Sequence, residues 1–143
     1  MADINTIIKT ESGIQEHYLE SKQYFAKNNI VGIFLQGSQN YGLETEDSDI
    51  DTKLITTPTL NDFIYNRKPM STTHFRANGE HIDFKDIRLM FDTFRKQNLN
   101  FIEILFTNYK IINPIYEKEW NKLIAENEVI AHYNPYFAVK AMS

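Results

Sequence analysis

The chain has 143 residues and contains no cysteine, which excludes disulfides, thiolate zinc sites and a cysteine nucleophile. Glycine and proline are scarce, at five and four residues, which excludes collagen-like and low-complexity chains. No apolar run reaches the roughly 18 residues of a membrane span. The first residues also lack the basic-then-apolar pattern of a secretory signal. We therefore expect a soluble, cytoplasmic protein that makes no membrane contact.

Positive charge is also in short supply. Lysine and arginine number 15 against 19 aspartate and glutamate residues, for a net charge of −4. This balance argues against a strongly basic module that coats nucleic acid. The length and the 42% hydrophobic content are typical of one domain, which we expect to cover residues 1–143. Residues 136–143 form an apolar stretch with no stop signal, so the alternative is the N-terminal part of a longer chain with its helical C-terminal region cut short.

The periodicity of apolar residues indicates a mixed α/β (α+β) protein. A helix is expected over residues 12–28, beginning at Ser12, and a short one from Thr59. Further helices are expected from Ile87, after Asn98 and around Trp120. The continuous apolar run 30–35 predicts a strand buried on both faces, and residues 49–56 predict a second strand.

Residues 71–77 and 80–86 predict a β-hairpin around Asn78-Gly79. Asn-Gly favours a two-residue type I′ turn, because both residues tolerate positive φ. Such a turn places His74 opposite Asp83, where it could orient the carboxylate; the alternative is an ordinary surface histidine. Alternation then predicts a core face of Thr73, Phe75, Ile82 and Phe84 and a polar face of His74, Arg76, His81, Asp83 and Lys85.

Three carboxylates and a Gly-Ser pair form the pattern that points to chemistry. Asp49 and Asp51 stand at i and i+2 of a predicted strand, so their side chains share a side, and such a pair needs a hard cation such as Mg²⁺. Asp83 stands between two apolar residues on a later strand and would join them if the strands are neighbours. Gly37-Ser38 follows the buried strand, where glycine allows backbone to approach a phosphate and serine donates to it.

The order of these elements resembles the DNA polymerase β-type nucleotidyltransferase superfamily: an apolar strand, Gly37-Ser38, about ten residues, Asp49-x-Asp51, and later apolar-Asp83-apolar. Within it the chain is most similar to the small predicted nucleotidyltransferases of bacteria and their phages. The resemblance implies a nucleotidyltransferase fold, with a short mixed sheet and helices packed mainly on one face. It also implies that Asp49 and Asp51 ligate metal, that Asp83 completes the site and helps activate the acceptor hydroxyl, and that Gly37 and Ser38 bind NTP phosphates.

The expected reaction is transfer of a nucleoside monophosphate from an NTP, with ATP among the candidates, to a hydroxyl, with release of pyrophosphate. Two Mg²⁺ or Mn²⁺ ions about 3.5–4 Å apart would support it. The acceptor is a nucleic acid, a small molecule or a protein. Lys53 and Lys85 share strand faces with the aspartates and are interpreted as triphosphate ligands, or else as lysines extending from the sheet to solvent. The alternatives are a catalytically silent nucleotide-binding regulatory or antitoxin-like module, and a scaffold fragment.

Overall fold

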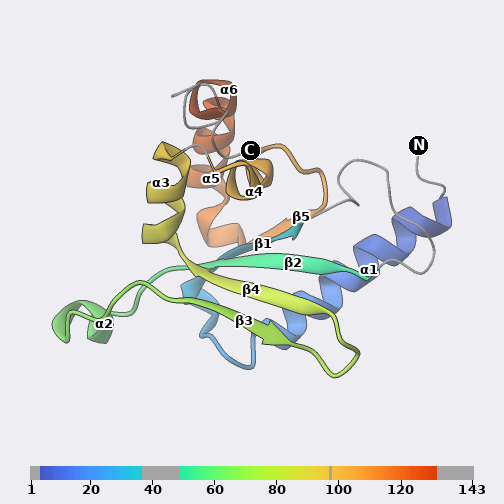
Figure 1. The fold of residues 1–143 in the computed structure, drawn as a ribbon, viewed down its shortest axis with the longest axis horizontal. Helices are drawn as coiled ribbons and strands as arrows, with labels where there is room; N and C mark the ends of the chain where they lie inside the picture. Colours follow the sequence, from blue (N-terminus) through green and yellow to red (C-terminus); the bar gives the residue numbers. More distant parts are fainter. Residues whose placement is uncertain (1–3, 37–48, 97, 132–143) are drawn as a thin grey trace.

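The computed structural model describes residues 4–36, 49–96 and 98–131, and this part of the chain contains a mixed sheet with helices around it (Figure 1). The strands are β1 (Ile30–Gln36), β2 (Asp51–Thr56), β3 (Ser71–Phe75), β4 (His81–Asp86) and β5 (Lys110–Ile112). The helices are α1 (Ile4–Ser21), α2 (Leu60–Ile64), α3 (Ile87–Arg95), α4 (Leu99–Ile102), α5 (Glu117–Ala125) and α6 (Asn127–Ala131). Among these helices, none is both long and apolar enough to cross a membrane.

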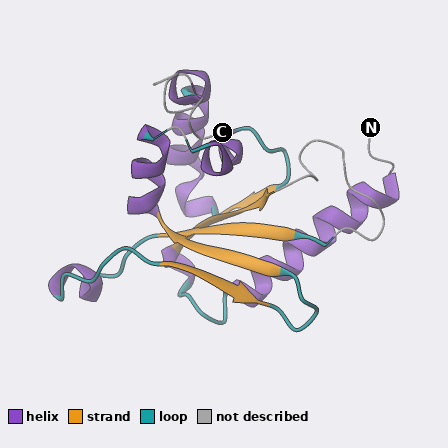
Figure 2. Cartoon of the chain, in the orientation of Figure 1, coloured by secondary structure: helices purple, strands orange, loops and turns teal. Residues whose placement is uncertain are grey.

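The five strands follow the order β3-β4-β2-β1-β5, and Figure 2 shows them in orange. Strands β2 and β4 run parallel, and the other neighbouring pairs are antiparallel. The expected short mixed sheet is therefore confirmed. Edge strand β5 was not predicted, because three residues are too few to show an alternating pattern.

Helices cover both faces of the sheet, so the predicted packing mainly on one face holds for α3 to α6 but not for α1, the longest helix. Helix α1 packs against one face, and α3 to α6 lie at the other (Figure 1). The cause lies in β1, in which Ile30 to Leu35 are all buried. Ile33 and Leu35 belong to the α1 core, while Phe34 belongs to the core under the C-terminal helices. A strand buried on both sides needs cover on both sides.

Helix α1 begins at Ile4 and ends at Ser21 rather than covering residues 12–28. The predicted start missed the first turns, although Ile4, Ile7 and Ile8 stand at helical spacing. In the structure Ile4 and Ile8 are exposed instead of packed. The expected start of α2 is confirmed, since Thr59 and Asp62 form a reciprocal capping box.

The hairpin of β3 and β4 closes with three residues rather than two. The Arg76 N–H donates to the Glu80 carbonyl and the Gly79 N–H to the Arg76 carbonyl, and Gly79 has a φ of 90°. Three-residue hairpin loops use glycine at such a left-handed position. The register consequently pairs Thr73 with Asp83 and His74 with Ile82. The predicted pairing of His74 with Asp83 is wrong by one residue.

This shift exchanges the predicted faces of β3 but leaves those of β4 unchanged. Ile82 and Phe84 are buried in the α1 core as expected. Their partners on that face are now Thr72 and His74, whereas Ser71, Thr73 and Phe75 share the face of Lys85, Asp83 and His81. Phe75, predicted to be core, is 70% exposed.

Candidate functional site

Two of the three predicted carboxylates lie on one face of neighbouring parallel strands. Register pairs Lys53 of β2 with Asp83 of β4, and Asp51 precedes Lys53 by two residues. Because side chains alternate along a strand, all three point to the same face. Both aspartates lie in the N-terminal halves of their strands, and α3 follows the C-terminal end of β4. The carboxylates therefore occupy the end of this face that is distant from α3.

Asp83 is held by side chains from the two strands that flank β2 and β4. Its Oδ1 atom accepts a hydrogen bond from the Thr73 hydroxyl at 2.8 Å, and its Oδ2 atom accepts one from the Gln36 amide at 3.1 Å. Gln36 also donates to the Thr52 carbonyl at 3.3 Å. Strands β3, β4 and β1 thus fix the plane of this carboxylate.

Asp51 is oriented by the first residue of β4. Its Oδ1 atom lies 3.2 Å from the backbone nitrogen and 3.1 Å from Nδ1 of His81. The two side chains are 31% and 35% exposed, so the pair is open to a ligand. Both contacts that Asp51 makes with described residues use Oδ1, which leaves Oδ2 able to take another partner.

The other predicted ligands are distributed around this pair. Asp49 is exposed and precedes β2, whereas Gly37 and Ser38 lie outside the described residues. Within residues 4–36, 49–96 and 98–131, no three His, Cys, Asp or Glu side chains are grouped so that they could hold a metal ion. The structure thus brings Asp51 and Asp83 together on one face and does not assemble a three-carboxylate centre there.

The two predicted phosphate-binding lysines differ in their surroundings. Lys53 is only 3% exposed, and its Nζ atom lies 4.2 Å from the centre of the Phe101 ring. Burial lowers the pKa of Lys53 to about 8, although the charges of Asp83 and Glu103 act in the opposite direction. Lys85 is half-buried, and its ammonium group donates to the Ser71 hydroxyl.

The residues that contact the carboxylates were only partly predicted. His81 was placed correctly on the polar face, but Thr73 was assigned to the core and Gln36 was not considered. Alternation along β1 could have found Gln36, which follows buried Phe34 by two residues. His74, expected beside Asp83, instead contacts Glu20 of α1 at 2.7 Å.

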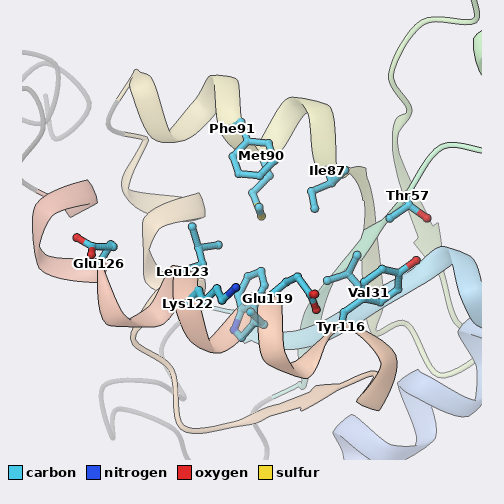
Figure 3. Close-up of a pocket in the computed structure, with 11 residues that line it drawn as sticks. Val31, Thr57, Ile87, Met90, Phe91, Tyr116, Glu119, Lys122, Leu123 and Glu126 are labelled. Atoms are coloured by element: carbon cyan, nitrogen blue, oxygen red, sulfur yellow. The ribbon is translucent and has the colours of Figure 1, made fainter.

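A pocket of about 360 Å³ lies elsewhere, between α3 and α5 (Figure 3). Met90 and Leu123 point toward one another across it, and apolar side chains dominate its lining. None of Asp49, Asp51 and Asp83 is among its lining residues. This pocket is therefore separate from the carboxylate face.

The chain matches no family model, no curated protein and no solved structure. Its function is consequently inferred from the residues themselves.

Proposed function

We propose that the chain is a metal-dependent nucleotidyltransferase that transfers a nucleoside monophosphate from an NTP to a hydroxyl acceptor. The observation that carries the proposal is the position of Asp51 and Asp83 on one face of adjacent parallel strands. Like charges on neighbouring strands repel unless a cation or a proton lies between them. Further support comes from the sequence, in which Asp49 stands two residues before Asp51 and Gly37-Ser38 follows β1.

The donor atoms on this face fit a hard divalent cation. Carboxylate oxygens are the ligands that Mg²⁺ and Mn²⁺ prefer, and Oδ2 of Asp51 has no contact with another described residue. Asp51 and Asp83 would hold the cation, with Asp49 as a further ligand. When bound, it would neutralise the carboxylates and stabilise charge on the transferred phosphoryl group.

The residues around the pair would position the reacting groups. The acceptor oxygen bonds to the α-phosphorus, the bond to the bridging oxygen breaks, and pyrophosphate leaves. The acceptor proton passes to Asp83, whose carboxylate is held in one plane by Thr73 and Gln36. Buried Lys53 would add positive charge beside the carboxylates on the same face. Half-buried Lys85 would add positive charge two residues further along β4. Positioning and electrostatics of this kind supply most of the catalysis in phosphoryl transfer.

A second candidate is a nucleotide-binding module that does not turn over. One observation favours it, because Asp83 already accepts a hydrogen bond on each of its oxygens and Asp51 already pairs with His81. Carboxylates whose charge is stabilised by hydrogen bonds and by a histidine do not require a metal ion. Nucleotide binding without release of pyrophosphate would identify this alternative.

Metal binding is the first test of the proposal. Calorimetric titration with Mn²⁺ should show binding to the wild-type chain and at least tenfold weaker binding to Asp51→Asn. Asp92→Asn is the matched control, because Asp92 is a half-exposed acid of α3 that pairs with Arg95 and Lys96 of the same segment. Equal Mn²⁺ affinity in wild type and Asp51→Asn would refute the site.

Turnover is the second test. The protein is incubated with each α-labelled NTP and Mg²⁺ or Mn²⁺, together with candidate RNA, small-molecule and protein acceptors. We expect label on one acceptor class, stoichiometric pyrophosphate, and neither product with Asp83→Asn. Mass spectrometry of the protein itself detects self-modification.

A further inference from the structure

A buried hydrogen-bonded chain lies behind the Asp51 segment, on the α1 side of the sheet. The Glu80 carboxylate accepts a hydrogen bond from the Ile50 N–H at 2.8 Å and lies 3.0 Å from His17 Nε2. His17 Nδ1 lies 2.8 Å from the Thr52 hydroxyl. The His17 side chain is fully buried and that of Glu80 is 12% exposed. One helix, one hairpin loop and the start of β2 are joined by these contacts.

The direction of each hydrogen bond follows from the chemistry of the groups. A carboxylate only accepts, so Nε2 of His17 carries the hydrogen that faces Glu80. Burial lowers the pKa of His17, although the hydrogen bond to Glu80 acts against this shift. Burial thus favours the neutral ring, in which Nδ1 carries no hydrogen and accepts from the Thr52 hydroxyl.

The anchored residues stand on either side of Asp51. Ile50 is held through its backbone by Glu80 and through its side chain by α1, where a Cβ atom added to Gly13 would lie 2.2 Å from Ile50 Cδ1. Thr52 is held through its hydroxyl by His17. Because Asp51 lies between two fixed residues, its own side chain has little freedom to move on the opposite face.

The hairpin residue after Glu80 contacts Asp51 from the other side. His81 donates its backbone N–H to Asp51 Oδ1, while the neighbouring Glu80 side chain holds Ile50. Arg76 Nη1 and Asn78 Nδ2 donate to Glu80 at 3.0 and 2.8 Å, which keeps its carboxylate in place. Two consecutive residues, Glu80 at the end of the hairpin connection and His81 at the start of β4, thus contact residues 50 and 51 from the two faces of the sheet.

We propose that Glu80 and His17 are positioning residues that hold the 50–52 backbone so that Asp51 presents its carboxylate to a divalent cation. This inference rests on the proposed function, because it assigns to these residues an effect on metal binding. Burying the Glu80 carboxylate and the His17 imidazole costs desolvation free energy. If these positions served only to fill space, apolar residues would do so without that cost. Their contacts instead end on the two residues that flank Asp51.

The test compares Glu80→Gln with the matched control Glu20→Gln. Glu20 also binds Arg76, at 3.3 Å, and belongs to α1, but among the described residues its carboxylate contacts His74 and Arg76 rather than residues 49–52. After circular dichroism establishes folding, Mn²⁺ affinity should fall about tenfold in Glu80→Gln and change less than twofold in Glu20→Gln. Amide exchange measured by NMR should accelerate at least tenfold over residues 50–52 in Glu80→Gln alone. Thr52→Val removes only the hydroxyl that His17 contacts, and takes the place of Glu80→Gln if that variant does not fold.

The outcomes separate this inference from the proposed function. Wild-type Mn²⁺ affinity in folded Glu80→Gln overturns the positioning role, whatever the exchange rates. If the wild-type chain itself does not bind Mn²⁺, the proposed function fails. Exchange then decides whether Glu80 orders the segment: acceleration over residues 50–52 supports it, and unchanged exchange overturns it.

Discussion

Near the start of β2, the polar side chains on the two faces of the sheet differ in their exposure and in how fully they are hydrogen-bonded. On the α1 side, His17 uses both ring nitrogens and Glu80 both carboxylate oxygens in contacts with described residues. On the other side, Asp51 and His81 are about one-third exposed, and Lys53 is buried with a lowered pKa. Satisfied buried groups support the fold, whereas a buried charge that costs free energy is typical of a binding or catalytic site.

The largest effect is expected from adding a carboxylate on the face of β4 opposite to Asp83. Ile82 is fully buried in the α1 core and Asp83 is its neighbour on the other face. Ile82→Asp places an unpaired carboxylate in that core, at a cost of several kcal/mol. We expect loss of the cooperative thermal transition in Ile82→Asp. Asp83→Asn, the matched change on the opposite face, should keep that transition.

Removing the buried charge of Lys53, beside the carboxylates, should stabilise the folded protein instead of destabilising it. The gap between the ordinary lysine pKa of 10.5 and about 8 in the folded chain corresponds to roughly 3 kcal/mol. Lys53→Met should therefore raise the free energy of unfolding at pH 7, up to that limit, in urea denaturation. Because the folded pKa is the lower one, the wild type should gain stability as pH rises from 8 toward 10.5. The variant should gain less, because it keeps Lys110, whose pKa burial also lowers, but not Lys53. A loss of stability in Lys53→Met would mean that attraction to Asp83 and Glu103 outweighs burial.

Residue patterns in the sequence predicted most of the strand face that carries Asp51 and Asp83, but few of the residues that contact it. The apolar run of β1 and the alternation of β4 gave correct strands, since both signals are local. The hairpin register was wrong because Asn78-Gly79 suits both a two-residue turn and a three-residue loop. The observed register is the one in which Arg76 and His74 contact Glu20 of α1, and the local sequence does not show these contacts. The pairing of His17 with Glu80 joins residues 63 positions apart, and no sequence spacing encodes it.

The smallest effect is expected from the buried histidine of the α1 side, His17, and it appears in the pH dependence of the free energy of unfolding. The folded pKa of His17 lies below the ordinary value of 6.5, first because burial disfavours the charged ring. The unfolded chain thus takes up a proton more readily, so the stability from His17 is complete above pH 6.5 and is lost as pH falls below it toward the folded pKa. One proton limits this slope to about 1.4 kcal/mol per pH unit.

Urea denaturation at pH 7.5, 6.5 and 5.5 should show a shallower pH dependence in His17→Gln than in wild type. His74, His81 and His132 remain in both proteins, so the difference reports on His17 and its contact with Glu80. Parallel curves would mean that folding leaves the pKa of His17 unshifted. A wild type that gains stability relative to His17→Gln as pH falls would mean that the ring is charged in the folded chain, and that the Thr52 hydroxyl accepts from the ring instead of donating to it.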